Sequence, residues 1–408
     1  MKRTTSGRRP SAHSAGGRHR GTRGQAGPPP NESRVSGTRP WPNIHSGHSR
    51  SYDGPVYGKR VSPEWRAAIV AVVVVTTLLV LLVVHGRTGA AGGTAARASG
   101  GSTAAGSPGL SPDGSCGPGP ARIPLTAGVH TFAYHGTSRH YRLSIPTHYD
   151  GRRAYPLLFD FHGFKADGVL EEQRSRMGAV GPARGFLVVT PDALGVPTRW
   201  NTPGDPVKAD DLGFVDALLT DLGGRFCLDA RRVYATGHSN GAEFAAALVC
   251  HSGRFAAVAM VSSTSEARCP AGRAPATMAV HGTADPSVPY DGGLVVGATV
   301  PVPAAPVVMR GYAGRYGCDP LPASTQPAAG VVALRFTGCA AGSEVLFDTV
   351  VGGTHFWPSS PEARRDPHTS AAGRTFDATG AILDFFTAHR APAPSTTRPT
   401  LAAGPAGQ

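Results

Sequence analysis

The sequence has few cysteines, and none of them is spaced to hold a metal. The six cysteines in 408 residues include no C-x-x-C pair, which is a usual signature of zinc and redox sites. Aromatic residues make up only 7% of the chain, and no nucleic-acid recognition motif occurs. These absences argue against a zinc-binding or nucleic-acid-binding protein, and we expect neither a metal nor a cofactor.

Residues 1–66 have few apolar side chains and an excess of positive charge. They carry 13 Lys and Arg against three acidic residues, so they account for +10 of the chain's net charge of +13. Such a segment cannot bury a core, and we expect a disordered basic tail. Its arginines could contact anionic lipid headgroups or nucleic acid, but a solvated tail is the simpler interpretation.

An uncharged apolar run of 18 residues, 67–84, follows this tail. At about 1.5 Å per residue it is long enough to cross the hydrocarbon core of a bilayer, which predicts a transmembrane helix over 67–85. The arginine excess before it predicts a cytoplasmic tail, with the rest of the chain outside the cell membrane. A cleaved signal peptide is the alternative, because Ala96-Arg97-Ala98 resembles a cleavage site and would release a secreted protein.

The remaining chain is predicted to form one domain between two low-complexity segments. Residues 86–114 are rich in Gly, Ala, Ser and Thr, which predicts a flexible linker. Residues 391–408 are rich in Pro and Ala without periodicity, which predicts a disordered tail. The segment 115–390 is long enough for one large core, and we expect a single domain that is monomeric.

The most informative motif is GHSNG at 237–241, in the pattern G-x-S-x-G. An apolar strand pattern at 232–236 precedes it, and an apolar stripe at helical spacing follows it over 240–250. This order of strand, tight turn and helix is typical of a nucleophile elbow, in which the turn exposes the serine. Ser239 is therefore the candidate nucleophile, and the amide of Asn240 is the first candidate oxyanion donor. A surface serine in a glycine-rich turn is the alternative.

A serine nucleophile needs a histidine base and an acid, in the chain order Ser, Asp, His for this type of elbow. Asp285 lies in HGTADPSVPY, just after a predicted strand at 277–281. His355 lies in GGTHFWP, after the last predicted strand. We therefore expect Asp285 as the acid and His355 as the base. We interpret His281 as a structural partner of the Asp285 loop.

The HGF turn at 162–164 follows another apolar strand, 157–161. In serine hydrolases with this type of elbow, a turn at this place supplies the second oxyanion donor. The amide of Phe164 is the preferred candidate, and that of Gly163 is the next. An ordinary loop turn is the alternative. Four aromatic side chains are candidates for the walls of a substrate pocket, and each could equally be a core or rim residue: Trp200, Phe164, Phe356 and Trp357.

The chain resembles the extracellular polyhydroxybutyrate depolymerases and the feruloyl and acetylxylan esterases, including the LpqC-like esterases. The resemblance covers residues 115–390 and rests on the segments PLLFDFHGF, RWN, DDLGFVDALL, RVYATGHSNGAEFAAAL, MAVHGTADPSVPY and GGTHFWP. It implies an α/β-hydrolase fold and a serine esterase. Thr354 replaces a glycine of the family and Phe356 replaces a small residue, and both are expected to narrow the pocket beside the base.

All six cysteines follow the apolar run, where an even count favours disulfides in an oxidising compartment. Nearness in the sequence together with the family resemblance implies three pairs: Cys250 with Cys269, Cys318 with Cys339, and Cys116 with Cys227.

Alternating strand and helix patterns predict an α/β fold with a mostly parallel central sheet and helices on both faces. Two strands, 129–135 and 139–145, precede the alternation. Parallel strands are expected at 157–161, 186–190, 232–236, 257–262, 277–281 and 344–351. Helices are expected at 210–226, where Asp210 and Asp211 would cap the first turn, at 240–250 and at 379–389.

These motifs together predict an exported or membrane-anchored serine esterase that acts on a polyester or an acylated polysaccharide. Two alternatives remain: an acyltransferase of the cell envelope that uses the same acyl-enzyme, and a non-catalytic binding protein that keeps the fold. Loops at 198–207 and 299–308 are expected to set the specificity.

Overall fold

The structure is a computed structural model, and it describes residues 110–111, 116, 124–201 and 209–392. All of these lie in the second of two units of the chain, Ser99–Gln408. The predicted basic tail, the transmembrane helix, most of the linker and nearly all of the C-terminal tail lie outside the described residues. Within the described ranges, no helix is both long and apolar enough to cross a membrane.

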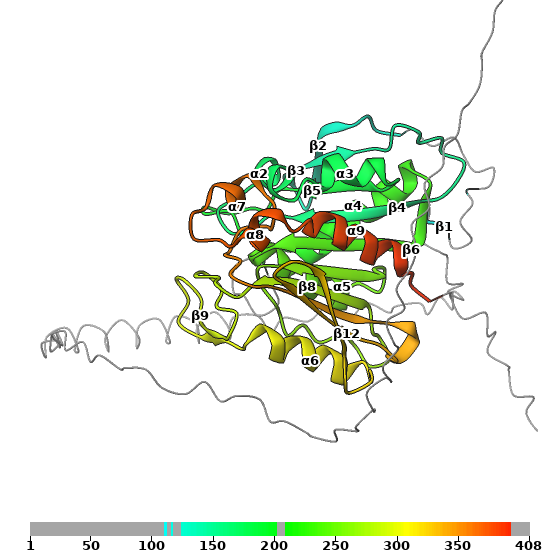
Figure 1. The fold of residues 1–408 in the computed structure, drawn as a ribbon. Helices are drawn as coiled ribbons and strands as arrows, with labels where there is room; N and C mark the ends of the chain where they lie inside the picture. The colour runs from blue at the N-terminus through cyan, green and yellow to red at the C-terminus, as the bar shows by residue number, and fades with distance from the viewer. Residues whose placement is uncertain (1–109, 112–115, 117–123, 202–208, 393–408) are drawn as a thin grey trace, which may run out of the picture. The chain divides into compact units, whose positions relative to one another are not determined.

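One large sheet runs through the described domain (Figure 1). Its centre is parallel, in the order β13, β8, β7, β6, β4, β5. Antiparallel strands extend both edges, β3 and β2 beyond β5, and β12 and β11 beyond β13. The strands of this sheet are β1 Leu110–Ser111, β2 Gly128–Tyr134, β3 Thr137–Ser144, β4 Tyr155–Phe161, β5 Leu187–Pro191, β6 Leu228–His238, β7 Ala257–Val261, β8 Ala276–Gly282, β11 Ala323–Ala328, β12 Val331–Phe336 and β13 Val345–Val350. A separate antiparallel pair is formed by β9 Gly293–Leu294 and β10 Pro301–Val302.

Helices cover both faces of the sheet, because alternate side chains of its buried strands point to opposite sides. On β4, Phe159 and Phe161 join the core under α4, α5 and α6, whereas Leu158 joins the core under α3 and α9. The α/β-hydrolase fold with helices on both faces is therefore as predicted. The helices are α2 Gly168–Ser175, α3 Met177–Ala183, α4 Asp211–Arg225, α5 Asn240–His251, α6 Ala305–Arg315, α7 Pro361–Arg365, α8 Ala371–Thr375 and α9 Ala378–Ala388, with the short 3-10 helix η1 Ala340–Gly342.

Several segments differ from the sequence-based prediction. The expectation of a loop over 299–308 is wrong for its last four residues, because α6 begins at Ala305 with Pro306 in its first turn. The edge strand β11 was not predicted, since its sequence ASTQPA is exposed and contains a proline, which only an edge strand tolerates. β1 lies inside the predicted linker, where it pairs in parallel with the start of β6.

The domain contains three disulfides, and they are the three pairs that the family resemblance implied. Cys116 is bonded to Cys227, Cys250 to Cys269 and Cys318 to Cys339. The first joins the N-terminal arm to the residue just before β6, across 111 residues of chain. Cross-links across long chain segments stabilise the fold mainly by restricting the unfolded chain.

Two buried carboxyl groups, one on α2 and one on β4, lie where this helix contacts the strand. Asp160 on β4 accepts a hydrogen bond from the Ser175 hydroxyl at 2.6 Å, while its other oxygen and both oxygens of Glu171 have no partner in the described part of the chain. Both side chains are fully buried. Burial raises the pKa of Asp160 and raises that of Glu171 well above the ordinary carboxyl value.

We expect Asp160→Asn to reduce the loss of stability that occurs as pH rises from about 4 to about 8. The folded state keeps a proton on Asp160 at pH values where the unfolded chain, with an ordinary pKa of about 3.9, has released it. The free energy of unfolding therefore falls as pH rises above about 4, until pH reaches the raised pKa of Asp160 in the folded protein. Asn does not titrate, so it does not contribute to this fall. Melting temperatures measured from pH 5 to pH 8.5 should show the variant gaining on the wild type as pH rises. Parallel curves would contradict this role of Asp160.

Candidate active site

Ser239 lies at a tight turn between β6 and α5, and this turn requires glycine at positions 237 and 241. Its backbone has φ of 55° and ψ of −121°, a left-handed conformation that costs energy for any residue with a side chain. A Cβ atom on Gly241 would lie 2.1 Å from the carbonyl oxygen of Phe161, and one on Gly237 would lie 2.6 Å from the Gly241 carbonyl. The Ser239 N–H donates to the Val261 carbonyl at 2.9 Å, which holds the turn against β7.

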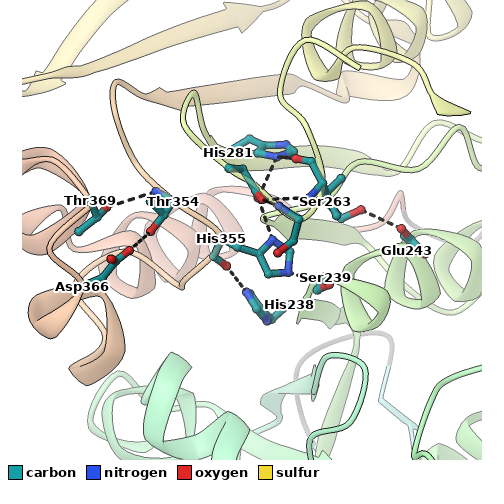
Figure 2. Close-up of polar contacts among 12 residues, drawn as sticks. His238, Ser239, Glu243, Ser263, His281, Thr354, His355, Asp366 and Thr369 are labelled. Atoms are coloured by element: carbon teal, nitrogen blue, oxygen red, sulfur yellow. Dashed lines mark hydrogen bonds and ion pairs between the residues drawn. The ribbon is translucent and has the colours of Figure 1, made fainter. Parts of the chain in front are cut away.

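The structure brings Ser239, His355 and Asp285 into one hydrogen-bonded series (Figure 2). The Ser239 hydroxyl donates to His355 Nε2 at 3.0 Å, and His355 Nδ1–H donates to Asp285 Oδ2 at 2.8 Å. The three residues follow β6, β13 and β8 at the C-terminal ends of these parallel strands. Strand ends of a parallel sheet meet at one edge, so side chains far apart in the sequence converge there.

Asp285 is buried and held as an anion by several donors. Burial by itself would raise its pKa, but hydrogen bonds from His281 and His355 and from the Val288 backbone outweigh this and hold the pKa well below its ordinary value. Its Oδ1 accepts from the N–H groups of Ser287 and Val288 at 2.8 and 2.9 Å. His281 Nε2 lies 3.3 Å from Asp285 Oδ2 and 3.0 Å from the Val288 carbonyl oxygen. His281 is therefore a structural partner of the Asp285 loop, as expected.

His238 is a site residue that the sequence did not single out. Its Nε2–H donates to the backbone carbonyl of His355 at 2.6 Å, and the two rings lie 5.0 Å apart. Burial lowers the pKa of His238 to about 3, so the ring is neutral and fixes the loop that carries His355. In the sequence, the only indication of this role is that His238 precedes Ser239 in the elbow. The role could not be predicted because the partner of His238 is a main-chain atom 117 residues away.

The two expected oxyanion donors are the backbone N–H groups of Asn240 and Phe164. The N–H of Asn240 is the first of α5, where helical N–H groups have no intrahelical partner and the helix dipole is positive. No hydrogen bond of the Phe164 N–H occurs within the described residues. A Cβ on Gly163 would lie 3.4 Å from the Ser239 Cβ, so the HGF turn passes directly beside the nucleophile.

The side chain of Asn240 joins the elbow to the RWN segment. Its Oδ1 accepts from the Trp200 N–H at 2.8 Å, and its Nδ2 donates to the Trp200 carbonyl at 3.3 Å. The next residue, Asn201, donates its N–H to Asp211 Oδ2 at 2.8 Å. Asp211 also pairs with the buried Arg139 at 2.7 Å, so it is mainly an ion-pair partner, and the side chain that caps α4 is that of Asp210.

Two of the four aromatic candidates for pocket walls are in the core instead. Trp200 is fully buried and stacks on Phe244 with a centroid distance of 4.8 Å, and Trp357 is fully buried with its Nε1–H donated to Thr379. Neither presents a surface to a substrate. Phe356 is half-buried beside the base, and the Phe164 side chain is 48% exposed.

Thr354 does not narrow the pocket as expected. Its hydroxyl donates to Asp366 Oδ2 at 2.7 Å and its N–H to the Thr369 hydroxyl, on the side of His355 away from Ser239 (Figure 2). A cavity of about 700 Å³ instead opens beside Phe164 and is lined by Leu194, Val196 and Pro197 among others. In the described part of the chain, no group of three or more His, Cys, Asp or Glu side chains is placed to hold a metal ion.

No protein-family model matches the chain. The chain is similar to the probable feruloyl esterase C of Aspergillus niger, with 30% identity over 216 residues that span 51% of this chain and 72% of that protein. It is also similar to feruloyl esterase C of Emericella nidulans, with 30% identity over 238 residues, 55% of this chain and 79% of that protein. A solved structure of a thermostable esterase is similar with 19% identity and a TM-score of 0.43, over 65% of this chain and 63% of that one.

Both feruloyl esterase C proteins are matched over more than two thirds of their length at 30% identity. The matches agree with the family resemblance carried by the sequence motifs, and the sheet has the topology expected for it. The chain therefore belongs to the feruloyl esterase family of carboxylic-ester hydrolases with the α/β-hydrolase fold.

Proposed function

We propose that the chain hydrolyses carboxylic esters by covalent catalysis, with Ser239 as nucleophile, His355 as general base and acid, and Asp285 as the orienting carboxylate. The observation that carries this proposal is the continuous hydrogen-bonded series from the Ser239 hydroxyl through both nitrogens of His355 to Asp285. Because Asp285 accepts from Nδ1–H, Nε2 is left as the acceptor that can remove the serine proton.

The chemistry follows from these positions. His355 Nε2 takes the proton of the Ser239 hydroxyl as its oxygen attacks the ester carbonyl carbon, and the oxyanion forms between the N–H groups of Asn240 and Phe164. The protonated His355 then gives its proton to the leaving alcohol oxygen, which yields the acyl-enzyme. Water attacks the acyl group with His355 again as base, and the acid product and free Ser239 result.

The proposed substrates are feruloyl or acetyl esters of plant polysaccharide or polyhydroxybutyrate-type polyesters, and the similarity to proteins named feruloyl esterase C favours feruloyl esters. The test is a comparison of kcat/KM for methyl ferulate, p-nitrophenyl acetate and hydroxybutyrate oligomers with the purified domain. We expect methyl ferulate to be hydrolysed. Activity on hydroxybutyrate oligomers alone would contradict the feruloyl assignment, and product analysis with added glycan acceptors would reveal an acyltransferase.

We also propose that the domain is exported and acts as a monomer. Three disulfides support export, because they persist in oxidising compartments. Anchoring through residues 67–84, which lie outside the described residues, is the form we favour over cleavage. Full-length protein in the membrane fraction is the expected result, and a soluble product whose N-terminus lies near Ser99 would show a cleaved signal peptide instead.

A further inference from the structure

The edge of the sheet opposite the candidate active site is formed by the starts of β4, β5 and β6 and by the end of α9 (Figure 1). Tyr155, the first residue of β4, is paired with Leu228, the first residue of β6. The Tyr234 hydroxyl donates to the His389 carbonyl at 2.7 Å, which brings the end of α9 to the same edge. The candidate active site lies at the other ends of these strands. Because β4 is 7 residues long, the two edges are separated by roughly 20 Å.

Arginine side chains gather at this edge, and we call it the basic face. Its arginines are Arg152, Arg153, Arg184, Arg231, Arg232 and Arg390, and the acidic residues among them are Asp150, Asp229 and Asp384. Six positive charges against three negative ones leave the face with a net charge of +3. Hydrogen bonds join its segments: Arg232 Nη2 donates to the Ala154 carbonyl at 2.8 Å, and Arg231 Nε donates to the Ala391 carbonyl at 2.7 Å.

Three of these arginines, Arg153, Arg184 and Arg232, line one cavity of about 200 Å³. Arg184 is held by Asp384 at 2.5 Å, and Arg232 is held by Asp229 at 2.5 Å. Arg153 forms no ion pair within the described residues, and its guanidinium carbon lies 4.7 Å from the centre of a tyrosine ring. Among the described residues that line the cavity there is no acidic side chain. Arginine binds phosphate through paired N–H groups, so this cavity has the charge and the donors that a phosphate group requires.

The N-terminal part of the chain enters the domain at the basic face. β1 pairs in parallel with the start of β6, where Leu110 is opposite Leu228. Cys116 is bonded to Cys227, and its N–H donates to the Arg152 carbonyl at 3.4 Å. The proposed anchor, residues 67–84, precedes β1 in the sequence and lies outside the described residues. A domain that is anchored through this segment is therefore tethered at its basic face and not at its active-site edge.

We infer that the basic face lies against the anionic phospholipid headgroups of the membrane, with a headgroup phosphate in the cavity of Arg153, Arg184 and Arg232. The inference rests on the proposed anchoring, which keeps the domain near a bilayer. Arginines are attracted to an anionic membrane surface, and the attraction extends over about one Debye length, so it acts on the face that the tether holds nearest. In this orientation the edge that carries Ser239 points away from the bilayer, where a polymeric ester has access to it.

The first test is sedimentation of the segment Ser99–Gln408 with lipid vesicles. This segment contains both hydrophobic cores and all three disulfides, and it lacks residues 67–84. We expect binding to vesicles of phosphatidylcholine and phosphatidylglycerol at low salt, and little binding to phosphatidylcholine alone. Binding should be lost at about 1 M salt, where the Debye length is about 3 Å.

Charge reversal locates the binding surface. The triple variant Arg152→Glu, Arg153→Glu, Arg390→Glu should weaken binding to the anionic vesicles by at least about tenfold, because all three side chains are exposed on the basic face. The matched control is the triple variant Arg310→Glu, Arg364→Glu, Arg365→Glu, which changes the net charge equally at exposed positions on α6 and α7. It should weaken binding much less, and both triple variants should keep the wild-type kcat/KM for methyl ferulate.

The full chain in vesicles of the same two compositions gives a second measurement. Phosphatidylglycerol should slow the modification of Arg153 by phenylglyoxal several-fold, read by mass spectrometry, and should leave that of Arg364 unchanged. Equal losses of binding in the two triple variants would overturn the inference, and so would equal binding to both kinds of vesicle. Binding of polyphosphate or inorganic phosphate without binding to the vesicles would assign the face to a different ligand. An inactive wild type would contradict the proposed catalysis without changing these measurements, and recovery of the chain in a cleaved form would contradict the anchoring alone.

Discussion

Replacing Ser239 by alanine should lower kcat/KM for methyl ferulate by at least about 10,000-fold, which is the order of loss when the nucleophile of a serine hydrolase is removed. The Ser239 oxygen is the atom that forms the acyl-enzyme, and His355 has no other hydroxyl within hydrogen-bond distance in the described residues. The alanine variant should keep its melting temperature or gain slightly, because the left-handed backbone at 239 is no less accessible to alanine. Steady-state hydrolysis and thermal melting measure both effects.

Labelling with a fluorophosphonate probe gives an independent measurement. We expect one equivalent of probe on the wild type and none on Ser239→Ala. Ser324→Ala is the matched control, because Ser324 is exposed on the edge strand β11 and should label like the wild type. Unlabelled but folded wild-type protein would support a non-catalytic binding protein, and persistent labelling of Ser239→Ala would place the nucleophile elsewhere.

Asp285→Asn should reduce kcat by about 10,000-fold while the protein stays folded, the order of loss known for the equivalent change in another serine hydrolase triad. The N–H groups of Ser287 and Val288 need an acceptor, so the carbonyl oxygen of the new amide would face them. Its NH2 group would then face His355 and donate to Nδ1. The proton of the imidazole ring would then be on Nε2. A protonated Nε2 cannot accept the proton of the Ser239 hydroxyl.

This prediction has a control in the same loop. Asp291 is exposed and has no part in the hydrogen bonds of Asp285, so Asp291→Asn should leave kcat unchanged. Measurement of kcat over pH 5 to 9 with both variants tests the explanation, because the wrong tautomer lowers kcat throughout this range. A variant that retains more than about a tenth of the wild-type kcat would contradict the role of Asp285 as the orienting group.

Much of the central fold was predictable because its signals are local. The parallel strands are short apolar runs buried on both faces, and β4, β7 and β8 are buried throughout. The edge strand β11 carries no such signal, since its side chains are solvated and its pairing with β12 depends on a turn. The strands β11 and β12 and the helices α2, α3 and α6 were not predicted, whereas the edge strand β2 and the strands that carry the candidate site were found.

The residues of the candidate site also differ in whether the sequence could predict their roles. Ser239, Asp285 and His355 were predictable because each follows a strand in a short motif whose order along the chain is characteristic. The role of His238 was not, because it depends on a main-chain carbonyl brought close by tertiary packing. For Trp200 and Trp357 the sequence left two possibilities, a pocket wall or a core or rim position. The structure places both indole rings in the core.

By itself, the sequence determined the type of fold, the elbow and the residues that could carry the chemistry, because backbone turns and buried strands depend on residues adjacent in the chain. Only the tertiary structure decided which side chains meet: the 3.0 Å and 2.8 Å hydrogen bonds of His355, and the burial of the two tryptophans. These depend on how the strand ends and helix faces pack together, and residues more than 40 positions apart in the chain come within hydrogen-bond distance only in the packed domain.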